Sequence, residues 1–157
     1  MMEKINYQLF KAFNDSFYET LKSMTALKVD RLLSGQDVES EYPQLQTMIA
    51  FGGGVEGFWR LKSSVASLLR LYEHYLGEKA EVLTEEVLDS IKELAGVIGG
   101  SASAKEQQLK LQFSPVVISV SEDIYAPLLA KESAASVNYY VDKCGVFTVE
   151  VHQREHE

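Results

Sequence analysis

The residues of this chain that could do chemistry gather on one side of an acidic helix. Thr84 is a helix N-cap residue, and the apolar positions that follow it recur with helical spacing. At 100° per residue, Glu86, Asp89, Glu93 and Gly96 all fall on the side opposite the apolar stripe. Three carboxylates on one side form either an ordinary solvated helix face or a docking surface for a cationic partner.

Glycine residues distinguish this helix from an ordinary solvated one. Gly96, Gly99 and Gly100 lie in it or directly after it, and a glycine inside a helix costs about 1 kcal/mol relative to alanine. A glycine on the exposed side, three residues after Glu93, allows another backbone or protein to approach closely. We expect Gly99 and Gly100 to break or kink the helix before residues 101–109 resume a helical composition.

A glycine cluster earlier in the chain matches a nucleotide-binding pattern without its context. Gly52, Gly54 and Gly57 satisfy G-x-G-x-x-G, which holds pyrophosphate only when the third glycine opens a helix. Here residues 58–61 follow with the composition of an amphipathic strand, and no Gly-Lys-Ser/Thr is present. We therefore interpret the cluster as the turn of a β-hairpin.

The remaining nucleophiles and metal ligands give weak signals. Cys144 and His152 form a conceivable nucleophile–base pair, but Cys144 sits in a Lys-Cys-Gly turn and His152 at the end of the last strand. His152 and His156 could share a metal only through chance proximity, and His74 is expected to be exposed on a helix. No H-E-x-x-H, Cys-x-x-Cys or G-x-S-x-G motif supports a metalloprotease, zinc site or hydrolase.

Length and charge narrow the class of protein. The chain has 157 residues, the length of one domain (1–157), and its net charge of −8 argues against nucleic acid as the main partner. A single cysteine excludes an internal disulfide. The N-terminus lacks a signal-peptide core, and no apolar run approaches the ~20 residues of a membrane span. We expect a soluble cytoplasmic protein that contacts no membrane and holds no metal or cofactor.

The remaining elements follow from periodicity and turn residues. Helices are expected at 5–24, from Ser63 or Ser64 to a cap at Gly77, and from Thr84 onward. Strands are expected at 45–51, 58–62, 116–120, 135–141 and 146–151. A loop is expected at 34–43, a turn at 142–145 and a solvated tail at 152–157. Neighbouring strands joined by turns favour an antiparallel or mixed sheet. The fold class is therefore α+β, with the helices packed on the sheet.

Three segments together resemble the CheC/CheX chemotaxis phosphatases. Residues 93–100, Glu-Leu-Ala-Gly-Val-Ile-Gly-Gly, resemble the family's E-L-G-N-x-x-x-G helix. Residues 51–57 are similar to its G-G-x-x-G hairpin, and residues 114–117 to its P-P-x-V segment before the closing strands. The resemblance covers roughly residues 45–151, and a single motif helix makes CheX the closer relative.

The resemblance implies a phosphatase that binds a phosphorylated CheY-type receiver domain, whose Mg²⁺ lies on the partner's side. It assigns docking to Glu93, with Glu86, Asp89 and Gly100 on the same binding face. In the family, the motif asparagine orients the attacking water, and here Gly96 stands in its place. We therefore expect receiver binding with phosphatase activity reduced or absent.

Two alternatives use the same sequence differently. One is a non-enzymatic dimerisation or scaffold module, because the resemblance implies a homodimer and exposed strands of this fold can pair edge to edge. The other is a small-molecule sensor that uses Phe51, Phe58 and Trp59, although aromatic residues of this kind are more often part of the core.

Overall fold

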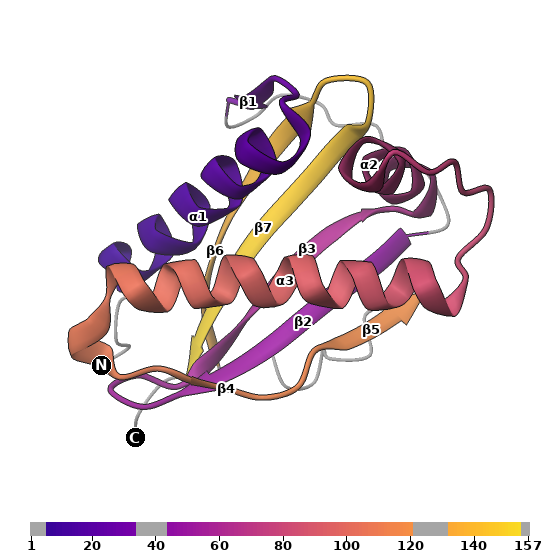
Figure 1. Cartoon of the computed structure of the whole chain (residues 1–157). Coiled ribbons are helices and arrows are strands. Elements are labelled where there is room, and N and C mark those ends of the chain that lie inside the picture. Colours follow the sequence, from indigo (N-terminus) through magenta and orange to yellow (C-terminus); the bar gives the residue numbers. More distant parts are fainter. Residues whose placement is uncertain (1–5, 34–43, 121–131, 155–157) are drawn as a thin grey trace.

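The computed structural model describes residues 6–33, 44–120 and 132–154 (Figure 1). Its helices are α1 (Tyr7–Thr25), α2 (Val65–Leu76), α3 (Glu85–Lys105) and the short 3₁₀ helix η1 (Gln107–Leu109). Its strands are β1 (Val29–Arg31), β2 (Gln44–Gly52), β3 (Gly57–Ser64), β4 (Gln112–Phe113), β5 (Val117–Val120), β6 (Glu132–Val141) and β7 (Gly145–Arg154).

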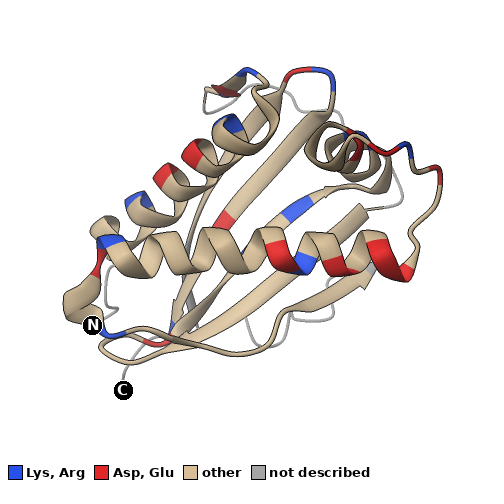
Figure 2. Ribbon diagram, in the orientation of Figure 1, with Lys and Arg blue, Asp and Glu red and all other residues tan. Residues whose placement is uncertain are grey.

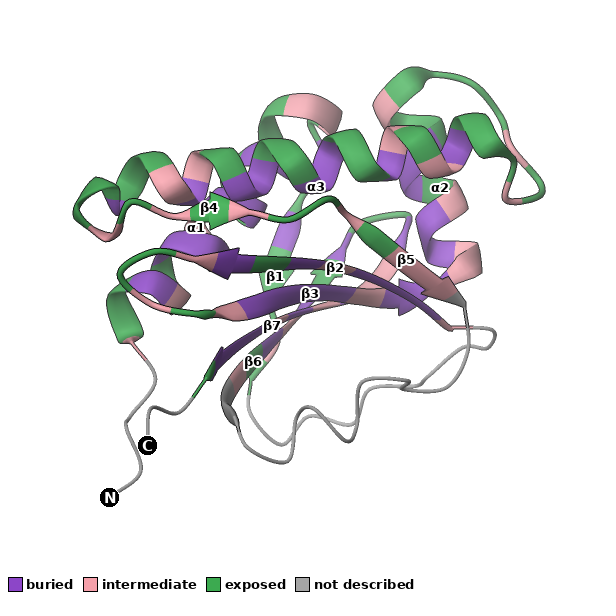
Figure 3. Ribbon diagram, turned by 90° about the horizontal axis from the view of Figure 1, so that it is seen from below, coloured by how far each residue is buried: buried purple, intermediate pink, exposed green. Residues whose placement is uncertain are grey.

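The strands form one antiparallel sheet in the order β1-β6-β7-β3-β2, with β4 and β5 both pairing with β2. The helices cover one face of this sheet, as the side view in Figure 3 shows, and the described residues place no helix on the other face. The expected α+β fold with helices packed on an antiparallel sheet is confirmed.

Each α-helix begins where a side-chain cap is available. The side-chain oxygens of Asn6, Ser64 and Thr84 accept hydrogen bonds from backbone amides three residues later, at 3.0, 3.0 and 3.2 Å. Gly77 ends α2 in the left-handed conformation, with φ of 75°. The caps expected at Ser64, Thr84 and Gly77 are thus confirmed.

The glycine cluster forms the turn of the β2–β3 hairpin, as expected. The two strands pair from Gln44–Ser64 to Phe51–Gly57 without interruption. Gly57 is required by packing, because a Cβ built there would lie 1.9 Å from the backbone oxygen of His152 on β7. The structure therefore contains a hairpin where a dinucleotide loop would need a helix.

Aromatic side chains fill the space between the helices and the sheet. The ring of Phe13 on α1 lies 5.4 Å from Trp59 and 5.8 Å from Phe51, centroid to centroid. Phe17 packs on Tyr139 at 5.0 Å. Phe51, Phe58 and Trp59 are all buried, as is common for aromatic residues of a core.

Two expectations about the elements are wrong, and two short strands were not predicted. α3 continues through Gly99 and Gly100 to Lys105 without a break, because packing of its buried side outweighs the low helix propensity of glycine. The tail is not solvated from residue 152 onward: β7 extends to Arg154, and His152 is buried. The two shortest strands, β1 and β4, carry too few residues for a periodic signal.

Candidate functional site

The outward side of α3 carries every site residue that the family resemblance assigns. Glu86, Asp89, Glu93, Gly96 and Gly100 are all exposed, as the helical wheel predicts. Figure 2 shows acidic residues along the N-terminal half of this helix. A Cβ built at Gly96 or at Gly100 would meet no neighbouring atom within 4 Å, so the helix surface is open at both positions.

The inward side of α3 holds the helix rigidly on the sheet. Its buried residues are Val87, Ile91, Leu94, Ala95, Ile98, Gly99 and Ala102. A Cβ at Gly99 would lie 3.6 Å from Nε1 of Trp59, an ordinary contact distance, so this glycine faces the core and not a partner. At the far end, Lys105 Nζ lies 2.8 Å from Glu19 Oε2, which ties α3 to α1. The acidic face therefore belongs to a helix whose position is fixed by packing against the sheet and by the ion pair with α1.

Two neighbours of Glu93 escaped the sequence analysis. Tyr75 on α2 lines a narrow groove with Ser90 and Leu94 of α3. Burial raises the pKa of Tyr75, and the nearby Glu93 carboxylate raises it further. Val97 is 40% exposed, which leaves an apolar contact between the two open glycines. Val97 could have been found as an apolar residue on an otherwise polar helix face. Tyr75 could not, because its spacing places it in the apolar stripe of α2.

No side-chain amide lies within reach of Gly96 along α3. Gln107 begins η1 eleven residues later, a distance of about 16 Å along a helix axis. The Gln108 amide Nε2 donates a hydrogen bond to the Glu106 carboxylate. Neither glutamine takes the place of an asparagine at position 96.

Comparison with known proteins decides the family. Residues 45–137, which include all of α3 and all of the β2–β3 hairpin except Gln44, match the family model described as chemotaxis phosphatase CheX. This chain belongs to the CheX family. A comparison with curated protein sequences finds no match.

Solved structures show the same CheX-type fold. The chain is similar to the chemotaxis protein CheX from Vibrio vulnificus, with a TM-score of 0.74 at 17% identity, covering 93% of this chain and 96% of that one. It is also similar to the CheX of a CheX–CheY–BeF₃–Mg²⁺ complex from Borrelia burgdorferi, with a TM-score of 0.76 at 16% identity, covering 97% and 100%. FliY from Thermotoga maritima matches with a TM-score of 0.63 at 14% identity, covering 90% and 84%.

In this CheX-family chain, Cys144 and His152 do not meet. Cys144 lies in the β6–β7 turn and His152 lies on β7 eight residues later, which corresponds to about 26 Å of extended strand. Burial raises the pKa of the Cys144 thiol to about 11, so the thiolate is scarce at neutral pH. The nucleophile–base interpretation is therefore excluded.

The structure describes two of the three histidines. His74 is exposed on α2, as expected, and His156 lies outside the described residues. Within residues 6–33, 44–120 and 132–154, no cluster of histidine, cysteine or carboxylate side chains could hold a metal ion. In the same residues, no helix is long and apolar enough to cross a bilayer.

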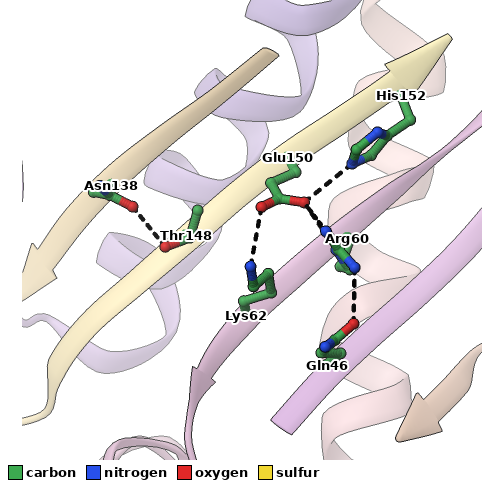
Figure 4. Close-up of polar contacts among 7 residues, drawn as sticks. All are labelled: Gln46, Arg60, Lys62, Asn138, Thr148, Glu150 and His152. Carbon is green, nitrogen blue, oxygen red and sulfur yellow. Dashed lines mark hydrogen bonds and ion pairs between the residues drawn. The ribbon is translucent and has the colours of Figure 1, made fainter. Parts of the chain in front are cut away.

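A second polar cluster lies on the helix-free face of the sheet (Figure 4). Glu150 on β7 accepts hydrogen bonds from Arg60 Nε at 2.8 Å and Lys62 Nζ at 3.3 Å, and contacts His152 Nε2 at 3.0 Å. The Arg60 Nη1 group donates to Gln46 Oε1 at 2.8 Å. Sequence reasoning missed this cluster, because its members are brought together only by the register of three strands.

The charges around Glu150 keep it ionised. Burial raises the pKa of Glu150, but the hydrogen bond with His152 and the positive charges of Arg60 and Lys62 outweigh burial and lower the pKa to about 2. The His152 ring also stacks on Phe58, with centroids 4.4 Å apart. Glu150 and Arg60 link β7, β3 and β2 through these contacts, while the buried Nδ1 of His152 neither accepts nor donates a hydrogen bond within the described residues.

Proposed function

We propose that this chain binds a CheY-type receiver domain through the exposed side of α3 and has little or no phosphatase activity. The proposal rests on two positions of α3. Glu93 is exposed, and Gly96, one turn later, leaves the helix surface open to a partner. Membership of the CheX family suggests the receiver domain as the partner. Glu93 suggests how that partner is bound, and Gly96 suggests why hydrolysis is slow. The same proposal treats residues 1–157 as one domain and places it in the cytoplasm with its partner.

The docking chemistry rests on charge and on close approach. Glu86, Asp89 and Glu93 present three carboxylates on one helix face, which favours a partner surface containing lysine. Gly96 and Gly100 leave the helix backbone uncovered, so a partner loop can lie directly against it. A related CheX from Borrelia burgdorferi has been solved together with CheY, BeF₃ and Mg²⁺, which supports a receiver domain as the partner.

The chemistry of hydrolysis explains the expected loss of activity. Attack on an aspartyl phosphate requires a water molecule aligned with the bond that breaks, together with charge stabilisation of the phosphoryl oxygens. The receiver domain and its Mg²⁺ provide the charge stabilisation. Alignment of the water needs a polar side chain at the position of Gly96, and glycine has none. The chain is thus suited to hold a phosphorylated receiver without accelerating its decay.

Reversing the charge of Glu93 tests the docking face. Glu93→Lys is expected to weaken binding of a beryllofluoride-activated receiver domain at least about 100-fold, because a lysine would face the partner's lysine. Isothermal titration calorimetry measures the affinity. The matched control is Asp142→Lys, which makes the same charge change in the exposed β6–β7 turn. Equal affinities of the two variants would contradict the proposed face.

The second candidate, a homodimeric scaffold, is favoured by the exposed strand β5. Within the described residues β5 pairs only with β2, and Val117 at its start is 44% exposed. If two copies pair along β5, Val117→Lys is expected to convert a dimer to a monomer, as measured by light scattering after size exclusion. A wild-type mass of one chain across the micromolar range would rule out the dimer.

A further inference from the structure

A groove with a volume of about 510 Å³ runs between α1 and the sheet edge formed by β1 and β6. It is lined by Tyr7, Phe10, Lys11, Asn14, Asp15, Tyr18, Arg31 and Tyr139. No residue of α3 lines it, so it is separate from the proposed docking face. Its volume lies in the range of small-molecule sites in proteins, which is about 300–1,000 Å³.

Aromatic rings form the walls of the groove. Tyr7 is 71% exposed and Tyr18 is 39% exposed, and the Lys22 ammonium lies 5.1 Å from the centre of the Tyr18 ring. Phe10 lies between them on the same side of α1 and is half-buried. Tyr7 and Tyr18 lie about 16 Å apart along the helix axis, so a planar ligand can stack on one of these two rings but not on both.

The floor of the groove is fixed by hydrogen bonds. The buried Tyr139 donates its phenolic hydrogen to Asn14 Oδ1 at 2.6 Å. Asn14 in turn donates from Nδ2 to the backbone oxygen of Phe10 at 2.8 Å. These bonds hold the floor and one wall in place before any ligand arrives, which lowers the entropy cost of binding.

Of the two cationic side chains that line the groove, one has no acidic partner among the described residues. Lys11 and Asp15 neutralise each other through an ion pair of 2.7 Å. Arg31 is exposed at the groove, and in the part of the chain that the structure describes no carboxylate pairs with it. An unpaired guanidinium beside aromatic walls, in a chain of net charge −8, favours a ligand that carries a carboxylate.

We propose that this groove binds a small molecule that combines a planar aromatic ring with a carboxylate group. The ring stacks on the exposed side chain of Tyr18, and the carboxylate accepts hydrogen bonds from Arg31. The sensor considered from the sequence therefore has a place in the structure, but it uses aromatic residues of α1 and not the buried Phe51, Phe58 and Trp59. This site goes beyond the proposed receiver binding and does not depend on it.

Three aromatic acids and their neutral amides test the site. Benzoate, 2-naphthoate and indole-3-acetate are titrated into the full chain, and binding is followed by ligand-observed NMR. At least one acid is expected to bind with a Kd below about 1 mM, and its amide at least about tenfold more weakly. If none of the acids binds up to about 5 mM, or if acids and amides bind equally, the proposal is wrong.

Variants of exposed residues locate the binding. Arg31→Gln is expected to abolish the preference for the acid over the amide, and Tyr18→Ala to weaken both about equally. Lys28→Gln is the matched control, because Lys28 is an exposed cation three residues from Arg31 that does not line the groove. An unchanged preference in Arg31→Gln, or the same loss in Lys28→Gln, would overturn the assignment of the carboxylate to Arg31.

Discussion

Replacing Gly96 with asparagine is expected to accelerate the hydrolysis of a phosphorylated CheY-type receiver domain by about 10²–10³-fold over the wild-type chain. This factor is the usual effect of one positioned polar group in an active site. The variant should fold, because a Cβ at Gly96 meets no atom within 4 Å and asparagine tolerates a helix better than glycine does. Loss of radiolabelled phosphate from the receiver, with each variant in catalytic amounts, gives the rate.

Gly96→Ala is the matched control for this experiment. It adds a side chain at the same open position but no amide that could orient a water molecule. Acceleration by Gly96→Asn alone would mean that the docking face is intact and only the water-orienting group is missing. Acceleration by the wild-type chain would contradict the role given to Gly96. No acceleration by any of the three proteins would favour the scaffold.

Glu150→Gln is expected to lower the free energy of unfolding by about 3 kcal/mol at pH 7. The substitution keeps the shape of the side chain but removes the negative charge between Arg60, Lys62 and His152, and breaking a buried ion pair typically costs this much. Urea denaturation followed by circular dichroism measures the change. Thr148→Val is the matched control, since it removes only the neutral 2.6 Å hydrogen bond to Asn138 and should cost about 1 kcal/mol.

The same residue predicts how stability depends on pH. The pKa of Glu150 is about 2 in the folded chain against an ordinary value of 4.5. A lowered carboxylate pKa contributes stability that is complete above the unfolded value and is lost as the pH falls toward the folded value. The difference in stability between the wild-type chain and Glu150→Gln should therefore be constant above about pH 5.5 and shrink between pH 4.5 and 2. A difference that stays constant down to pH 2 would contradict the charge network.

Much of the fold could be predicted from local patterns. The α2 and α3 boundaries follow from Ser64, Gly77 and Thr84, whose capping chemistry depends only on neighbouring residues. The exposed side of α3 follows from the helical period, which fixes where Glu93 and Gly96 point. The candidate site was thus readable because all its residues lie on one helix.

Features that depend on distant parts of the chain could not be predicted. Gly99 was expected to interrupt α3, but the surface it faces, which includes Trp59 on β3, is defined only by the tertiary fold. His152 looked like part of a frayed tail, whereas pairing with Phe58 on β3 keeps it in the sheet. The groove beside Arg31 could not be predicted either, because it forms between α1 and β1. A strand of only three residues leaves no periodic pattern in the sequence.

The central claim is that the exposed side of α3 binds an activated receiver domain. The most direct test is the amide NMR spectrum of the labelled chain during titration with an unlabelled, beryllofluoride-activated receiver. We predict shifts concentrated on α3 between Glu86 and Gly100, with none at the groove of Arg31. Shifts confined to β5 or to the groove, or no shifts with any receiver domain of the host, would contradict the account.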